Sequence, residues 1–152
     1  MKCICYKAGY KYQIYEDYIK AIGIKPGHDI DTKYISLSAS GNLTIRDGYA
    51  WDGPSGPTVD TENFMRGSLV HDALYQLMRL KAGSLSTTHK KAADQLLQKM
   101  CKQDGMSRLR AWWVYLAVSK FGNSATDPVN ARPLIGAPEG CNCDHLTSPL
   151  SA

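Results

Sequence analysis

The chain has 152 residues, of which 43% are hydrophobic and 21% are charged, a balance that excludes a disordered chain and favours one globular domain. No run approaches the roughly 18 consecutive apolar residues of a membrane-spanning helix. The first residues also lack the apolar stretch and cleavage site of a secretory signal. The net charge of +4 favours approach to phosphates or anionic lipid without selecting either.

The cysteines form two Cys-x-Cys pairs near the ends of the chain, at residues 3–5 and 141–143, with Cys101 between them. An odd number argues against a complete disulfide framework, so the sequence predicts a reducing, cytoplasmic environment. A zinc site that joins both pairs with His145 is an alternative, because thiolates and imidazole suit zinc. The Cys-x-Cys spacing is tighter than that of the usual zinc fingers, which makes this alternative less favoured.

The first half of the chain predicts antiparallel strands. Apolar and polar residues alternate over 35–39 and again over 43–45, and Ser40-Gly41-Asn42 between them has turn chemistry. Residues 10–14 show the same period of two and predict an earlier strand. The expected fold class is therefore α+β, with an N-terminal antiparallel hairpin or sheet ahead of the helices.

The middle of the chain predicts a shaped loop and then an antiparallel helix pair. The run 47–57 holds three glycines and two prolines, which is too many for a helix or a central strand. Apolar residues then recur at helical spacing from residue 60 or 61 to about 80, and again from 87 or 88 to 105.

A third helix is expected from Ser107 to Gly122, and its apolar run 112–118 includes Trp112 and Trp113. We interpret it as a core helix that closes the domain. Contact with a lipid interface is the alternative, because tryptophans favour that depth and basic residues flank the run. The domain is expected to span 1–122, and the proline-rich remainder, 123–152, is expected to be a tail or linker wrapped on its surface.

A polar cluster interrupts the apolar pattern of the first two helices. His71-Asp72 lies in mid-helix, Tyr75 follows one turn later, and Asp94 lies in the next helix. If the helices pack antiparallel across their short connection, Asp94 returns to the level of His71. An imidazole oriented by a carboxylate can deprotonate water as a general base. Asp72 points about 100 degrees away and is free to bind a cation.

A purely structural role is the alternative for this cluster. His71 would then be a satisfied core histidine, Asp72 would pair with a cation such as Arg79, and Asp94 would lie on a solvated face. The glycine-rich loop directly ahead of the helix favours a catalytic or metal-binding role instead. Such loops aim carbonyl oxygens at a hard cation or N–H groups at an oxyanion.

The motifs of the loop and the two helices occur in a recognisable order. They are Trp51-Asp52-Gly53-Pro54-Ser55, then His71-Asp72-Ala73-Leu74-Tyr75, then Ala93-Asp94-Gln95-Leu96-Leu97. This order resembles the active-site core of phospholipase A2, especially its compact bacterial and parvoviral forms. The resemblance spans about a third of the chain and implies that His71 activates water, Asp94 orients His71, and Asp72 binds calcium.

The resemblance also implies a role for the loop. The backbone carbonyls of Trp51, Gly53 and Ser55 would complete the calcium site, and the Gly53 N–H would face the oxyanion. Asp52 departs from the phospholipase loop, which usually has a neutral residue there, and it would be an extra metal ligand suited to a different cation or substrate. The disulfides that brace secreted phospholipases are also missing.

A second resemblance covers residues from the Lys33 hairpin to Phe121. The strand pair, the loop, His-Asp-x-Leu-Tyr, Ala-Asp and an Arg-x-Trp helix are similar in layout to a phage- and prophage-encoded family of unknown function. This resemblance implies no activity, only a phage context and hence the cytoplasm of a bacterial host.

The function expected from these patterns is calcium-dependent hydrolysis of a phospholipid or other small ester, with peripheral membrane contact as a further expectation. The first alternative is a metal-dependent phosphodiesterase of the HD type acting on nucleotides, which would need His28 as an additional ligand. The second is a non-catalytic phage accessory protein that binds a host ligand. No nucleic-acid-binding motif occurs in the sequence, and the sequence does not predict an oligomeric state.

Overall fold

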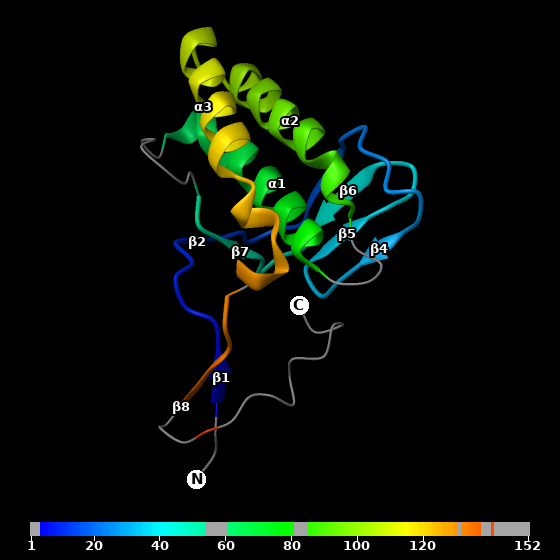
Figure 1. The fold of residues 1–152 in the computed structure, drawn as a ribbon, viewed down its shortest axis with the longest axis vertical. Coiled ribbons are helices and arrows are strands. Elements are labelled where there is room, and N and C mark those ends of the chain that lie inside the picture. Colours follow the sequence, from blue (N-terminus) through cyan, green and yellow to red (C-terminus); the bar gives the residue numbers. More distant parts are fainter. Residues whose placement is uncertain (1–3, 54–60, 81–84, 131, 138–140, 142–152) are drawn as a thin grey trace.

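The computed structural model describes residues 4–53, 61–80, 85–130, 132–137 and 141 (Figure 1). Seven strands of the described chain precede the first α-helix, an eighth follows the last one, and all of them pair antiparallel. The α+β class predicted from the sequence is therefore confirmed. The strands are β1 (Ile4–Tyr6), β2 (Tyr12–Gln13), β3 (Tyr18–Ala21), β4 (Ile30–Asp31), β5 (Ile35–Leu37), β6 (Asn42–Ile45), β7 (Ala50–Trp51) and β8 (Ile135–Ala137). The helices are α1 (Glu62–Arg79), η1 (Thr87–His89), α2 (Lys90–Gln103), α3 (Arg108–Phe121), η2 (Ser124–Thr126) and η3 (Pro128–Asn130), where η marks a 3₁₀-helix.

The hairpin predicted around Gly41 is confirmed. β5 and β6 pair antiparallel, with Ile35 opposite Ile45 and Leu37 opposite Leu43. Gly41 between them has a φ of +90°, which favours glycine over residues with a Cβ. β3 and β4 flank this hairpin in a sheet of order β3-β6-β5-β4. The early strand expected near residue 12 is the short β2, which pairs with β7 inside the glycine-rich run.

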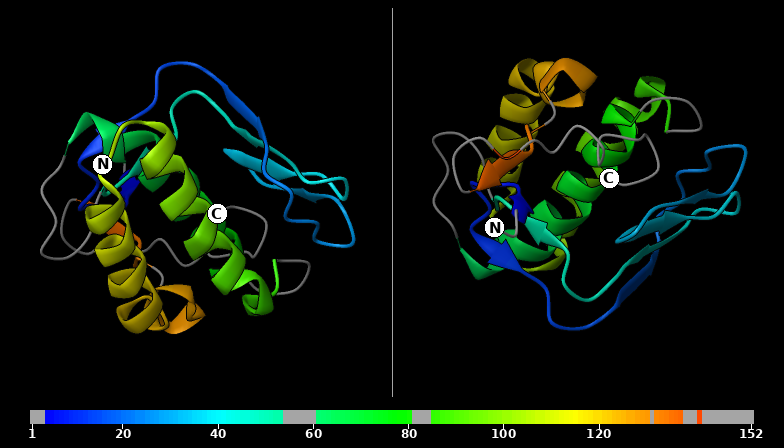
Figure 2. Two further views of the ribbon diagram at one scale, coloured as in Figure 1. Left: turned by 90° about the horizontal axis from the view of Figure 1, so that it is seen from above. Right: turned by 90° about the horizontal axis from the view of Figure 1, so that it is seen from below.

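The core forms where the sheet meets α1. Alternate residues of β5 and β6 face inward and are fully buried, as their period of two predicts. They share one cluster with Val70, Leu74 and Leu77 of α1. Figure 2 shows the sheet on one side of the helices and α3 on the side remote from the sheet. The sheet thus fixes one face of α1 and leaves its other faces to contact α2, β7 and η2.

α1 and α2 approach each other closely at Gly67. A Cβ at Gly67 would lie 3.0 Å from Leu97 Cδ1 and 3.1 Å from Cys101 Sγ. Residues early in α1 therefore contact residues late in α2, as the predicted antiparallel packing requires. Cys101 is buried as a free thiol, and this burial raises its pKa to about 12.

The interpretation of α3 as a core helix is wrong for its largest side chains. Leu109 is 75% exposed, Trp112 50% and Trp113 54%, whereas Ala111 and Val114 are buried. The helix carries apolar residues on both of its faces, so periodicity does not tell which face turns inward. The small residues face inward because they allow α3 to pack closely against α2. No helix in the described part of the chain is long and apolar enough to span a membrane.

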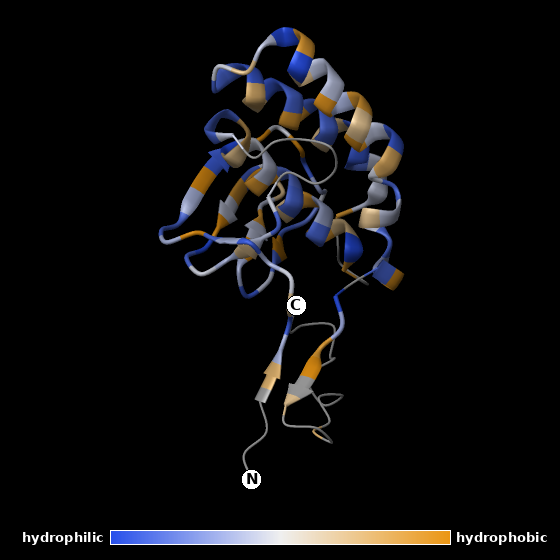
Figure 3. Ribbon diagram, turned by 90° about the vertical axis from the view of Figure 1, so that its left-hand side faces the viewer, coloured by the Kyte–Doolittle hydropathy of each residue, from blue (hydrophilic) through white to orange (hydrophobic). Residues whose placement is uncertain are grey.

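Segments after α3 pack on the domain. η2 contacts α1, and the side chain of Arg79 donates a hydrogen bond to the Ala125 carbonyl oxygen at 2.6 Å. Further on, β8 pairs antiparallel with β1, and Figure 3 shows this pair projecting from the body of the protein. Residues 124–126 therefore contact α1, and residues 135–137 pair with the N-terminal strand.

The cysteines do not match the reducing environment predicted from their odd number, although Cys101 is free and the disulfide framework is therefore incomplete. Cys5, on β1, and Cys141, just beyond β8, are each disulfide-bonded. Their sulfur atoms are then not thiolates, which removes two of the ligands that the zinc alternative needs. The other cysteines of the terminal pairs and His145 lie outside the described residues. An even number of the terminal cysteines can be oxidised while Cys101 stays free, so the odd total did not exclude disulfides.

Candidate functional site

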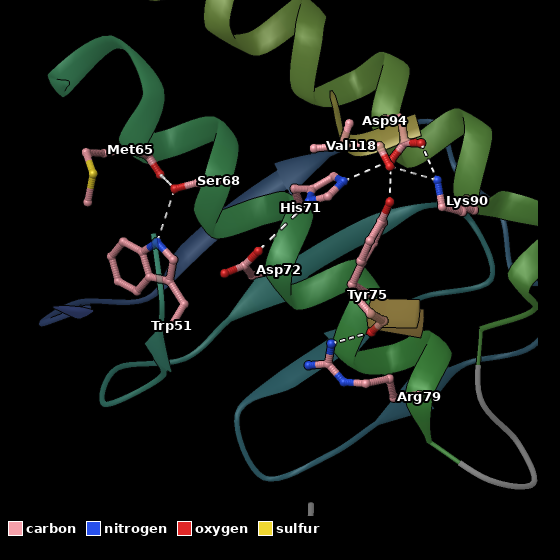
Figure 4. A network of polar contacts seen from close by, with 11 residues as sticks. Trp51, Met65, Ser68, His71, Asp72, Tyr75, Arg79, Lys90, Asp94 and Val118 are labelled. Atoms are coloured by element: carbon pink, nitrogen blue, oxygen red, sulfur yellow. Dashed lines mark hydrogen bonds and ion pairs between the residues drawn. The ribbon is translucent and has the colours of Figure 1, made fainter. Parts of the chain in front are cut away.

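A buried carboxylate, that of Asp94, collects polar side chains from α1 and α2 (Figure 4). Tyr75 donates its hydroxyl to Asp94 Oδ1 at 2.6 Å, and His71 Nε2 lies 2.9 Å from the same oxygen. Lys90 Nζ donates to Oδ2 at 2.8 Å, and the Ser119 hydroxyl lies 3.4 Å from Oδ2. Asp94 is only 1% exposed. The predicted contact of Asp94 with His71 is confirmed, and the alternative that placed Asp94 on a solvated face is wrong.

The surroundings of Asp94 keep its carboxylate charged. Burial by itself raises the pKa of Asp94, but hydrogen bonds from His71, Lys90 and Tyr75 outweigh it, and the pKa lies below its ordinary value. Burial likewise acts to lower the pKa of His71, whereas the carboxylates of Asp72 and Asp94 raise it, and the net shift is upward. The imidazole is thus a stronger base than a free histidine, and one of its nitrogens is fixed.

Asp72 lies on the other side of the His71 ring. Its Oδ1 is 3.9 Å from His71 Nδ1, and its side chain is 27% exposed. In Figure 4, Asp72 points away from Asp94 toward the side of Trp51. Arg79, the partner expected if Asp72 were structural, donates instead to a backbone carbonyl oxygen. His71 therefore has Nε2 bound to one carboxylate and Nδ1 turned toward a second one.

A cavity of about 100 Å³ separates Asp72 from the loop. Tyr49, Trp51 and Asp52 line it opposite Asp72. Burial raises the pKa of Tyr49 well above its ordinary value, and the nearby Asp72 carboxylate adds to this rise. The Tyr49 phenol therefore stays protonated. The side chains of Asp52 and Asp72 thus belong to residues that line the same cavity.

The start of the loop is held firmly against the helices and β2. Trp51 Nε1 donates to the Ser68 hydroxyl of α1 at 3.2 Å. Gly53 has a φ of +74°, and a Cβ there would lie 2.5 Å from the Tyr12 ring, so this position requires glycine. Ser55, which the resemblance implies as a calcium ligand, lies outside the described residues. Two of the three loop residues whose carbonyls are expected at the metal, Trp51 and Gly53, are thus fixed in place.

Asp52 has an unusual environment for a carboxylate. Its Oδ2 is ion-paired with Arg132, whereas its Oδ1 is buried and has no hydrogen-bond partner among the described residues. Such an orphaned acceptor is costly unless a ligand satisfies it. Oδ1 of Asp52, the carboxylate of Asp72 and loop carbonyls are all oxygen donors, the set that Ca²⁺ prefers.

Backbone oxygens matter for such a cation. In the described part of the chain, no three His, Cys, Asp or Glu side chains form a metal-binding group. The Trp51 carbonyl oxygen already accepts a hydrogen bond from the Lys11 amide at 3.2 Å, so only its second lone pair is open to a metal. The oxygen donors of Asp52, Asp72 and the loop are of the type that calcium prefers, and Asp72 carries the carboxylate that is not paired with an arginine.

Sequence reasoning missed several residues of this region. Lys90 lies four residues before Asp94, a spacing that places both on one helix face and was readable from the sequence. Arg132 lies 80 residues beyond Asp52 and carries no signal of this contact. For Tyr49, the sequence predicts only a position in the glycine- and proline-rich loop 47–57. Long-range contacts of this kind become visible only in the folded chain.

Comparison with protein families matches residues 29–118 to a family described as "Protein of unknown function (DUF1353)". The chain belongs to this family. The DUF1353 match runs from β4 into α3 and includes the loop residues 47–57, His71, Asp72 and Asp94. It leaves out β1 to β3 and the segments after α3. No curated protein and no solved structure matches the chain.

The expectation of a family of unknown function is therefore confirmed. Membership of DUF1353 brings no activity with it. An activity can therefore be inferred only from the geometry around His71.

Proposed function

We propose that this DUF1353 protein is a calcium-dependent hydrolase that cleaves an acyl ester of a phospholipid, as phospholipase A2 does. The observation that carries the proposal is the position of the His71 ring. Nε2 is held 2.9 Å from the buried Asp94 carboxylate, and Nδ1 faces Asp72 at 3.9 Å. This is the geometry of an oriented general base beside an anionic cation site.

In the proposed reaction, His71 Nδ1 accepts a proton from water while the water oxygen attacks the ester carbonyl carbon. Asp94 stabilises the imidazolium that forms, and Tyr75 and Lys90 keep Asp94 ionised and in place. The imidazolium then returns its proton to the leaving alkoxide as the ester C–O bond breaks. A fatty acid and a lysophospholipid result.

Asp72, Asp52 Oδ1 and loop carbonyl oxygens would hold the calcium ion. When bound, the ion would supply positive charge next to the ester carbonyl oxygen, where negative charge develops. The Gly53 N–H is the loop donor proposed for the same oxygen. The buried contact of Trp51 with Ser68 keeps the loop in position for both roles.

The exposed face of α3 supports a lipid substrate. Its large apolar side chains include Leu109, Trp112, Trp113 and Phe121, each at least half exposed. Arg108 and Lys120 flank them and are exposed as well. Tryptophan beside basic residues favours the headgroup region of an anionic membrane. Peripheral contact through this face would bring the enzyme to its substrate.

The phosphodiesterase alternative has less support. It requires His28 as a metal ligand, but His28 is exposed between β3 and β4 and does not line the Asp72 cavity. The phage context expected from the sequence stays a prediction.

The test is fatty-acid release from vesicles of phosphatidylcholine and phosphatidylglycerol, with calcium and with chelator. We expect His71→Ala to reduce release about 100-fold or more, because a general base contributes at least that much. Asp72→Asn should remove the calcium dependence together with activity. His28→Ala is the control histidine outside the site and should retain activity. Thermal melting checks that each variant folds.

Absence of release by the wild type at micromolar enzyme with calcium would overturn the proposal. So would release that persists in His71→Ala.

A further inference from the structure

A second cleft, of about 540 Å³, adjoins the Asp72 cavity. Residues that line both spaces include Tyr10, Asp52, Gln76, Arg79 and Arg132, so the two are contiguous. The walls come from the N-terminal segment, the end of α1, and the segments after α3. A molecule bound beside Asp72, the neighbour of His71, could therefore extend into this cleft.

The cleft carries an excess of positive charge. Among the described residues that line it, Lys7, Arg79 and Arg132 are cationic and Asp52 is anionic. Asp52 pairs with Arg132. No carboxylate within the described residues is ion-paired with Lys7 or Arg79. The cleft thus attracts an anion next to a site that itself favours a cation.

Both arginines donate to backbone carbonyl oxygens, and Arg132 is in addition ion-paired with Asp52. Arg79 donates to the Ala125 carbonyl oxygen at 2.6 Å, and Arg132 donates to the Ala8 carbonyl oxygen at 2.9 Å. The Arg132 guanidinium also lies over the Tyr10 ring, 4.9 Å from its centroid. A guanidinium has five N–H donors. Because its partner among the described residues is a neutral carbonyl oxygen, Arg79 keeps an uncompensated charge, and each guanidinium has further N–H donors for a ligand.

We infer that this cleft binds a phosphate-type oxyanion through Arg79 and Arg132, with Lys7 adding charge at the rim. Planar guanidinium groups match phosphate oxygens in pairs, and Gln76 offers a neutral donor between the two spaces. Only the assignment of the phosphate to a substrate rests on the proposed function. In that case the cleft holds the phosphate headgroup while the acyl ester lies at His71.

The first test measures binding of glycerol 3-phosphate by calorimetry in chelator, where no metal contributes. We expect Arg79→Gln and Arg132→Gln each to weaken binding about tenfold, as loss of a charged hydrogen bond implies. Asp52→Asn should tighten it, because the carboxylate competes for Arg132 and repels the anion. Arg46→Gln is the matched control, since Arg46 is also 36% exposed and also paired with an aspartate, but directly follows β6 and does not line the cleft.

Unchanged binding in both Arg79→Gln and Arg132→Gln would overturn the inference, as would equal weakening in Arg46→Gln. His71→Ala should bind glycerol 3-phosphate like the wild type. If the wild type hydrolyses no phospholipid but this arginine-dependent binding holds, the anion site stands and the proposed hydrolase falls.

A second measurement identifies the source of the phosphate. If it belongs to a lipid headgroup, Arg79→Gln raises the apparent KM for phosphatidylglycerol vesicles, and glycerol 3-phosphate inhibits hydrolysis competitively. If it belongs to a soluble phosphate ester, Arg79→Gln weakens glycerol 3-phosphate binding and leaves that KM unchanged. Both results support the anion site, and they assign it to different ligands.

Discussion

The Asp94 network and the cationic cleft differ in the burial of their charged groups and in the segments that supply them. Asp94 is buried, and its donors come mainly from α1 and α2, within the span that defines the family. The cleft is partly open, and Lys7, Tyr10 and Arg132 come from segments outside that span. Removing one partner from a buried charge network destabilises the protein strongly, whereas removing one partner from an exposed ion pair costs little stability. The proposed catalytic residues thus lie within the matched span, whereas the proposed anion site combines Arg79 of that span with residues of the flanking segments.

Removing the buried carboxylate should have the largest effect on stability. Asp94→Ala would leave Lys90, His71 and Tyr75 without their common acceptor inside the protein. We expect a loss of about 3 to 5 kcal/mol in the free energy of unfolding, measured by urea denaturation. A loss below about 1 kcal/mol would mean that the network is not cooperative and that its charges contribute no more to stability than those of the exposed cleft.

Tyr75→Phe should have an intermediate effect. Tyr75 is 3% exposed, and its hydroxyl donates to Asp94 at 2.6 Å. Loss of a hydrogen bond to a buried charge costs about 1.5 to 3 kcal/mol. The same urea titration measures the change, and a second titration of Tyr49→Phe compares a buried tyrosine that does not contact Asp94. Similar losses in both variants would contradict a special role for the Asp94 contact.

The stability that comes from Asp94 should depend on pH. The pKa of Asp94 is lower in the folded protein than in the unfolded chain, whose value is near 3.8. This contribution is therefore complete above the unfolded pKa and is lost as the pH falls through the folded pKa. The difference in unfolding free energy between the wild type and Asp94→Asn should be largest near pH 7 and should shrink below about pH 4. A difference that grows toward acid pH would have the wrong sign.

Changes in the cleft should affect stability least. Arg132→Gln breaks an ion pair in which both side chains are 36% exposed. Such pairs contribute less than about 1 kcal/mol, so its melting temperature should stay close to that of Arg46→Gln. A loss as large as that of Tyr75→Phe would show that the C-terminal segment is part of the cooperative core and would remove the distinction between the two regions.

The sequence predicted the elements that depend on local patterns. The turn at Gly41 and the alternation around it predicted β5 and β6. Helical spacing predicted α1 and α2, and their short connection placed Asp94 beside His71. These predictions held because each depends on neighbours close in sequence or on one short connection.

Predictions failed where the local sequence was compatible with two structures. α3 has apolar residues on both faces, and only packing against α2 decided that Ala111 and Val114 turn inward while Trp112 and Trp113 stay exposed. The terminal cysteines gave an ambiguous redox signal, and the disulfide bonding of Cys5 and Cys141 became evident only in the folded chain.

By itself, then, the sequence determined the α+β class, the helix pair and the approach of His71 to Asp94. Periodicity and chain geometry fix such features within a few turns. Only the tertiary structure decided that Tyr75 donates to the Asp94 carboxylate and that Arg132 returns to Asp52. A contact between residues 80 positions apart leaves no local trace, because it arises from how all the intervening elements pack.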